Sequence, residues 1–443
     1  MSVKLFNLKV NIYFENLLVI FIIISIFHKS YIPFKYVPYE KNIIFIIIMI
    51  SVSYIFLYYS KKNNIFTLLL NRKWKIEKIK SFLTQIFFKN SIKATEFKDI
   101  FYSVMFYALF LSYAVNVSYV YGPFLSTNIV LLSLLSYPAY ACLGIFCSKY
   151  KEVSITIIFF LSFIYLLFSL NALYCGIIAI KLKGFQNIFS HEVAINKSLY
   201  QNINLYLGIF SVISSSFIIY ERNKLYTKFF SIILLLTSIF LMTLIGGRGS
   251  FIAVLIVIFF QFILRIYQEF SLNKKYSIFY LVLFCLLIIT LLLINSYFSQ
   301  YSITLTRLNI LQDFQNDPSK RITLFTQAFS LFAERPFFGS GLGSFPYFIG
   351  KGDVPGWYPH NFILELLCEL GIFGICLFFI PFYFIFYRIN KINDFYSYAL
   401  LFLLFYLLII SMESGSVANL EIIVFLSCVF VFNPRDIPLK DDK

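Results

Sequence analysis

Residues 359–374 read PHNFILELLCELGIFG, and the apolar run that begins in this stretch continues to about residue 387. A helix needs about 20 apolar residues to cross the hydrocarbon core of a bilayer, so the run predicts a membrane span over 361–387. Its first turns carry Glu365 and Glu369, which lie one helical turn apart and therefore on one face. Carboxylates inside a membrane are costly unless they face a polar cavity, so this junction is the first candidate for a functional site.

The composition of the whole chain fits a membrane protein. Of its 443 residues, 60% are hydrophobic and 13% are charged, whereas soluble domains carry about 25% charged residues. Further apolar runs predict, together with 361–387, an all-α multi-pass membrane protein with about twelve transmembrane helices. These other runs are about 12–27, 42–59, 99–121, 126–148, 153–180, 201–220, 226–246, 250–267, 277–298, 395–412 and 416–433.

The positive charges are distributed unevenly over the connections between these spans. With the N-terminus in the cytoplasm, 25 of the 37 Lys and Arg residues fall on the cytoplasmic side, ten of them in the basic loop 60–98. This asymmetry is the positive-inside bias, and it predicts that both termini are cytoplasmic. Topology therefore accounts for the net charge of +16, and we expect no nucleic-acid partner.

The span pattern divides the chain into three parts. Residues 1–298 contain nine spans and the basic loop, 299–360 form a large extracytoplasmic loop, and 361–443 contain three spans and a short cytoplasmic tail. A long loop in a compact membrane protein is usually functional or separately folded. Apolar residues spaced by three and four predict a helix over 319–334 in this loop, ending at Arg335-Pro336.

Two arginine-containing motifs fall on the predicted outer face. The short connection 246–250 reads GGRGS and leaves Arg248 at the membrane surface, either as a functional group or as an interfacial anchor in a helix hairpin. The second motif contains Arg321 and then, after the predicted loop helix, Arg335 and a glycine-rich segment. Arginine suits phosphate oxygens, and a glycine-rich backbone can approach an anion closely, although such glycines often only make turns. The glycines are Gly339, Gly341 and Gly343.

His360 and Asn361 form the third feature, at the start of the span 361–387. A histidine with a pKa near 6.5 can act as a base or bind an anion, and the alternative is an interfacial residue that caps the helix. Glu413 and Glu421 lie near the outer ends of the last two spans. Such carboxylates could support a proton path, hold the arginines or line a polar groove.

Other chemistries find no support in the residue pattern. The seven cysteines lie almost entirely within apolar runs and lack metal-ligand spacing, so they are interpreted as core residues and no metal is expected. The glycine-rich segment does not follow a strand, which argues against a dinucleotide site. No Asp-x-Asp pair marks a nucleotide-sugar metal site.

Together these motifs resemble the O-antigen ligase/polymerase superfamily, which comprises Wzy-type polymerases and WaaL-type ligases. The likeness lies in Gly-Gly-Arg-Gly at 246–249, in the Arg321 to Phe345 pattern, and in Pro359-His360-Asn361 followed by Glu365, Glu369 and Gly371. The motifs cover about 246–375, and the predicted topology extends the resemblance over the chain. Gly247 stands where the family often has Ser.

The resemblance implies an all-helical glycosyltransferase of the bacterial inner membrane, with no cofactor and a periplasmic active site. Its donor is a glycan on a polyprenyl pyrophosphate such as undecaprenyl pyrophosphate, and an acceptor sugar hydroxyl displaces the pyrophosphate with inversion. Arg248, Arg321 and His360 match the family's catalytic positions. The residues expected to bind substrate are Arg335, Gly339, Gly341, Gly343, Asn361, Glu365 and Glu369.

Three activities remain open at this point. A polymerase extends lipid-linked repeat units of O-antigen, capsule or exopolysaccharide, with a chain-length regulator as a partner. A ligase transfers the glycan to lipid A-core in lipopolysaccharide biosynthesis. A flippase would move the same lipid-linked sugars, but it needs charges along a central cavity, whereas the candidate residues here gather at one face. The absence of any feature that marks a lipid A-core acceptor favours the polymerase.

Overall fold

The computed structural model describes residues 2–5, 8–11, 94–121, 137, 140–141, 143–145, 147–148, 150–183, 197–220, 225–245, 248–272, 278, 282, 285, 321–352, 357–388, 394–414 and 420–431. These residues are helical apart from short turns and an antiparallel hairpin of β1 (Ser2–Leu5) and β2 (Leu8–Asn11). The helices are α5 (Ala94–Tyr121), α7 (Lys151–Lys183), α9 (Lys197–Tyr220), α10 (Leu225–Ile245), α11 (Arg248–Leu272), α15 (Arg321–Glu334), α16 (Ser344–Phe348), α17 (Phe362–Arg388), α18 (Phe395–Ser414) and α19 (Glu421–Val431).

The described helices agree with the apolar runs. Among the described residues, five helices are long and apolar enough to cross a membrane, namely α9, α10, α11, α17 and α18. The predicted loop helix over 319–334 is confirmed as α15, which ends just before Arg335. The predicted spans 12–27 and 42–59 and residues 60–93 of the basic loop lie outside the described residues, whereas the last five residues of that loop, 94–98, form the start of α5. The total of about twelve spans therefore stays a prediction.

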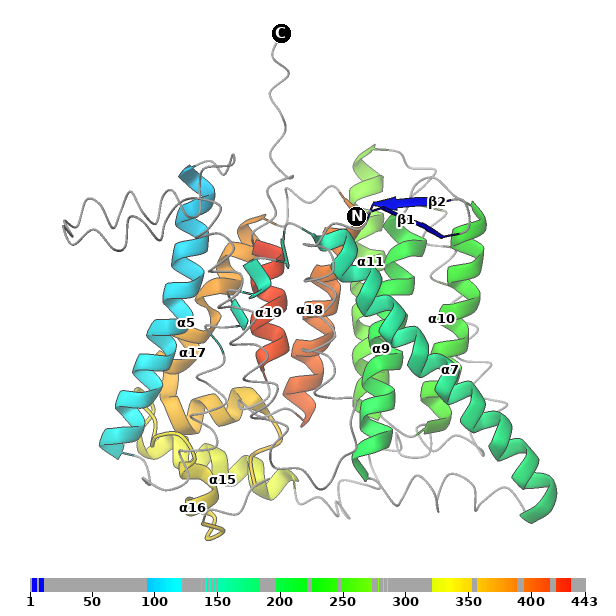
Figure 1. Ribbon diagram of the computed structural model, residues 1–443. Coiled ribbons are helices and arrows are strands. Elements are labelled where there is room, and N and C mark those ends of the chain that lie inside the picture. Colours follow the sequence, from blue (N-terminus) through cyan, green and yellow to red (C-terminus); the bar gives the residue numbers. More distant parts are fainter. Residues whose placement is uncertain are drawn as a thin grey trace.

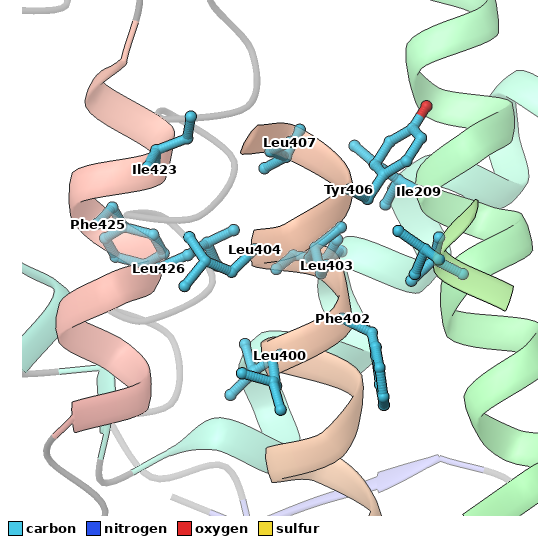
Figure 2. Packing of buried hydrophobic residues seen from close by; sticks show 14 of the residues in the cluster. Ile209, Leu400, Phe402, Leu403, Leu404, Tyr406, Leu407, Ile423, Phe425 and Leu426 are labelled. Carbon is cyan, nitrogen blue, oxygen red and sulfur yellow. The ribbon is translucent and has the colours of Figure 1, made fainter. Parts of the chain in front are cut away.

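The core lies between the long helices, and α18 is at its centre. α9 packs against α7, α10, α11 and α18, while α17 packs against α5, α15 and α19. Figure 2 shows α18 between α19 and α9, with Leu404 directed toward Leu426 and Tyr406 directed toward Ile209. The Tyr406 hydroxyl donates a hydrogen bond to the Leu205 carbonyl at 3.0 Å. These contacts fix the position of α18, which carries Glu413 near its end.

The small helices α15 and α16 lie together at one end of the long helices, opposite the β1–β2 hairpin (Figure 1). The buried face of α15 consists of Leu324, Ala328 and Leu331. It packs on Phe345 of α16 and Cys368 of α17 in a small apolar cluster. The predicted outer loop is therefore attached to the membrane helices through a core of its own.

Helix α17 corresponds to the predicted span 361–387, and it is broken at Gly371, which the residue pattern did not predict. Gly371 has φ 67° and ψ −170°, so its backbone is not helical. This region of conformational space is essentially restricted to glycine. The segment Phe362–Leu370 therefore forms a separate helical piece before the longer remainder of α17.

The loop between α15 and α16 supplies the hydrogen bonds that the break removes from α17. Ser340 and Gly341 donate their N–H groups to the carbonyls of Cys368 and Glu369, at 3.1 and 2.8 Å. In the other direction, the N–H groups of Ile372 and Phe373 donate to the carbonyls of Pro336 and Phe337, at 2.9 and 3.2 Å. The Tyr113 hydroxyl of α5 donates to the Leu370 carbonyl at 2.8 Å. Residues 336–341, here named the elbow, thus supply partners for the backbone groups on both sides of the break in α17.

Two glycines allow this close backbone contact. A Cβ at Gly339 would overlap the backbone of Glu369 and Leu370, and a Cβ at Gly371 would overlap the carbonyl group of Phe337. Both residues also have positive φ angles, 75° and 67°. The elbow and the break in α17 therefore depend on a pair of facing glycines.

Candidate active site

Four chain segments that are far apart in sequence meet at the α15 end of the molecule. Arg321, the first residue of α15, forms an ion pair with Glu413 of α18, with 3.0 Å between Nη1 and Oε1. The Glu413 carboxylate also lies against Gly249, in the first turn of α11. The charges of Arg321 and Glu413 both act on His360, which precedes α17. This group of residues is here named the Arg321–Glu413 site.

Arg248 belongs to the same region through its backbone. It is the first residue of α11, directly before Gly249, whose Cβ position is filled by the Glu413 carboxylate. The apolar runs place Arg248 in the connection between two predicted spans, and the structure places it at the start of α11. Its neighbours Gly246 and Gly247 lie outside the described residues. The catalytic role of Arg248 stays a prediction.

His360 has an unusual backbone conformation. Its φ of 55° is the one positive value among the non-glycine residues that the structure describes. Such a conformation is strained for a residue with a side chain, and strain of this kind is often found at functional sites. The imidazole ring packs on Tyr358, with 4.3 Å between the ring centroids. The backbone thus turns the imidazole into a defined position at the entrance to α17.

The surroundings of His360 favour its neutral form. Burial lowers the pKa of the imidazole, the positive charge of Arg321 lowers it further, and the negative charge of Glu413 opposes both effects. A histidine with a lowered pKa is neutral at pH 7 and can accept a proton. The neighbouring Tyr358 phenol has a raised pKa, chiefly because it is buried and then because of the charge of Glu365, so it remains a neutral donor.

Asn361 has a structural role in the described contacts. Its Oδ1 accepts hydrogen bonds from the N–H groups of Ile363 and Leu364, at 3.0 and 3.1 Å. This is the capping arrangement of a helix N-terminus, where N–H groups otherwise lack partners. The cap places His360 immediately before the first turn of α17. Substrate binding by Asn361 stays a prediction.

The glycine-rich segment 339–343 uses its donors within the protein. The elbow bonds described above occupy the N–H groups of Ser340 and Gly341, and Gly339 donates to the Arg335 carbonyl at 2.9 Å. Leu342 donates to the Ser118 hydroxyl at 2.9 Å. The N–H groups of Gly343 and Phe345 face the Glu369 carboxylate, with 3.3 Å from Phe345 N to Oε1. Anion binding by the three glycines stays a prediction, and their described role is close packing.

Glu365 and Glu369 are both buried on the first part of α17. Glu369 accepts a hydrogen bond from the Phe345 N–H in the first turn of α16, so it stabilises this part of the predicted outer loop. Glu365 is near enough to Tyr358 for its charge to raise the pKa of that phenol. Of the two carboxylates, Glu365 is the one whose charge acts on Tyr358, the residue that packs on His360.

The structure does not bring Arg335 together with Arg321. The 14 residues of α15 separate them, which corresponds to about 20 Å along a helix axis. The guanidinium of Arg335 instead lies over the Tyr121 ring, 4.6 Å from its centroid. Substrate binding by Arg335 stays a prediction, and any such contact is remote from the Arg321–Glu413 site.

The prediction that carboxylates near the ends of the last two spans hold the arginines is confirmed for Glu413 and Arg321. Tyr358 was not among the predicted site residues, although it lies only two positions before His360. Within the described part of the chain, no group of three or more His, Cys, Asp or Glu residues could hold a metal ion.

Long apolar helices with a cluster of ionisable residues at one end define a multi-pass membrane protein with a candidate enzymatic site. Residues 231–379 match the family model Wzy_C, described as O-antigen ligase, and they form an O-antigen ligase family domain. Members of this family are membrane enzymes that transfer glycans. The matched region contains every predicted site residue, whereas Glu413 lies beyond its end. A search of curated proteins found no match to the chain.

Proposed function

We propose that the protein polymerises lipid-linked oligosaccharide repeat units at the outer face of the inner membrane. The observation that carries the proposal is the meeting of Arg321, His360 and the start of α11 at one end of a membrane-helix bundle, all within the O-antigen ligase family domain. A glycan on polyprenyl pyrophosphate places its phosphates at the lipid surface and its sugars in water. The position of the Arg321–Glu413 site at the end of the helices suits that substrate.

The proposed reaction needs one proton acceptor and fixed positive charge. The acceptor hydroxyl forms a bond to the anomeric carbon of the donor, and the bond from this carbon to the pyrophosphate oxygen breaks. Neutral His360 takes the hydroxyl proton. Arg321 and Arg248 stabilise the negative charge that develops on the departing pyrophosphate. The lowered pKa of His360 and the position of Arg321 beside it support this division of roles.

The second candidate is an O-antigen ligase, which the description of the matched family favours. It uses the same donor chemistry and differs in the acceptor, which is lipid A-core. The glycan profile of a strain lacking the gene separates the two activities. Single repeat units on the core indicate a lost polymerase, whereas naked core with polymer accumulated on the lipid carrier indicates a lost ligase. Unchanged polysaccharide would contradict both.

The rate of transfer should depend on the protonation of His360. Because burial and Arg321 lower the pKa of this imidazole, the base is neutral and active at pH 7, and kcat/KM should fall only as the pH drops below about 6.5. In Glu413→Gln the contribution that raises this pKa is lost, so the acid limb of the normalised profile should move to lower pH. A rate that rises as the pH falls through this range would instead assign charged His360 to pyrophosphate binding.

The proposed topology is tested by cysteine labelling of the outer loop. Lys351 is exposed, and we expect Lys351→Cys to react with a membrane-impermeant maleimide added to intact cells whose outer membrane is permeabilised. Lys78→Cys, in the basic loop 60–98, is the control and should react only after the inner membrane is opened. Labelling of the parent protein gives the background from the native cysteines. The reverse pattern would overturn the orientation inferred from the charges.

A further inference from the structure

Glu413 lies outside the matched family region, yet it joins two parts of the candidate site. It comes from α18, accepts a hydrogen bond from Arg321, and fills the space beside Gly249 at the start of α11. The backbone carbonyl of Glu413 also lies 3.4 Å from Arg321 Nη1. One residue thus holds the guanidinium of α15 against the ends of α11 and α18.

The ion pair has the properties of a contact that a ligand can replace. The two side chains are 26% and 34% exposed, so water and solutes can reach them. Partly exposed pairs of this kind contribute little to stability, because water screens the charges and ordering the side chains costs entropy. The guanidinium has five N–H donors, and Glu413 occupies at least one of them on Nη1. The negative charge of Glu413 also repels an anion that approaches the same guanidinium, so a pyrophosphate that binds Arg321 competes with Glu413.

We propose that Glu413 is a positioning residue, which holds Arg321 in place in the empty protein and releases it to the pyrophosphate of the donor. The inference rests on the proposed function for the identity of the anion. The Glu413 carboxylate faces Arg321 and Gly249, and its charge also reaches His360. The same residue therefore orders the anion-binding arginine and adjusts the base.

A purely structural role makes different predictions. If Glu413 only joins α15 to α18, its removal lowers the amount of folded protein and leaves the affinity of the remaining molecules for an anion unchanged. A matched control is available on the same helix. Asp394, just before the other end of α18, pairs with Lys151 at 2.7 Å. Asp394→Asn makes the same carboxylate-to-amide change, about 28 Å away along the helix.

The test is the binding of inorganic pyrophosphate to the full-length protein in nanodiscs, followed by calorimetry. Removal of the competing charge in Glu413→Gln should tighten pyrophosphate binding about fivefold. Glu413→Asp, which keeps the charge, and Asp394→Asn should bind as the parent does, and Arg321→Ala should lose binding. Unchanged or weaker binding by Glu413→Gln, or no binding by the parent protein, would overturn the inference.

Kinetics with the lipid-linked donor give the second readout. Glu413→Gln should lower KM for the donor, because competition is removed, and should also lower kcat, because Arg321 is no longer held in its reactive geometry. A lower kcat with an unchanged KM would indicate loss of folded protein and contradict the inference. Failure of the proposed function is distinguishable, since it would appear as a parent protein that binds pyrophosphate but transfers no glycan.

Discussion

Arg321→Ala should abolish the formation of long glycan chains while the protein remains in the membrane. Loss of one preorganised group that stabilises developing negative charge typically costs about 10²–10³-fold in rate. Arg321 is held by Glu413 beside His360, so its position is set before the donor arrives. We therefore expect a rate loss at the upper end of this range, measured as initial transfer of glycan from the lipid-linked donor.

Related variants sharpen this test. Arg321→Lys keeps the charge but not the planar fork, so it should recover only part of the rate. Arg248→Ala and His360→Ala should also eliminate chain-length ladders in cells. Glu334→Gln is the control, because Glu334 is exposed at the opposite end of α15 and should leave the ladders unchanged. Normal ladders in all three of Arg321→Ala, Arg248→Ala and His360→Ala would show that the site has been assigned wrongly.

Gly371→Ala should have the largest effect on folding. The substitution places a Cβ where the φ of 67° and ψ of −170° are strongly disfavoured, and this Cβ would overlap the carbonyl group of Phe337. The backbone strain alone costs on the order of 1–3 kcal/mol. Because the overlapping atoms are backbone, relief of the overlap requires separation of the elbow from α17, which exposes the hydrogen bonds of Ile372 and Phe373. We expect little folded protein in size-exclusion profiles of detergent extracts.

A matched control separates the two causes of this effect. Gly350 also has a positive φ, 72°, but nothing lies within 4 Å of the position that its Cβ would take. Gly350→Ala therefore tests the backbone strain without the overlap and should lower the midpoint of thermal unfolding only slightly. If both variants lost the same amount of folded protein, the contact between the elbow and α17 would not be the reason for Gly371.

Much of the fold could be predicted from the sequence because hydrophobic runs directly reflect the cost of placing polar groups in lipid. The runs near 201–220, 226–246 and 395–412 correspond closely to α9, α10 and α18. The break in α17 could not be predicted in this way. The run continues unchanged through Gly371, and the partners that satisfy the broken helix come from the elbow and from Tyr113 of α5, far away in sequence.

In the candidate site, too, individual residues could be predicted from local motifs, whereas their contacts with residues distant in sequence could not. Arg321 and His360 were identified from motifs, and the structure brings them within electrostatic range of each other. The pairing of Arg321 with Glu413 depends on how α15 docks beside α18, which no local pattern specifies. The glycines were expected to approach an anion, but the N–H groups of Gly341 and Gly343 face acceptors of Glu369 in α17, and Gly339 donates to the Arg335 carbonyl. A run of glycines indicates that N–H groups are accessible, but it does not show whether their acceptor is a bound anion or another part of the protein.

The elbow also has a consequence for the biogenesis of the protein. Residues 336–341 precede α17 in the chain, so in the predicted topology they reach the outer surface before the helix that they complete has been made. Lipid offers no partners for the carbonyls of Cys368, Glu369 and Leu370, so the first part of α17 can enter its final position only together with the elbow. The predicted outer loop and the tenth predicted span should therefore mature as one unit across the boundary at residue 360. A chain divided between them should not reassemble from separately inserted halves.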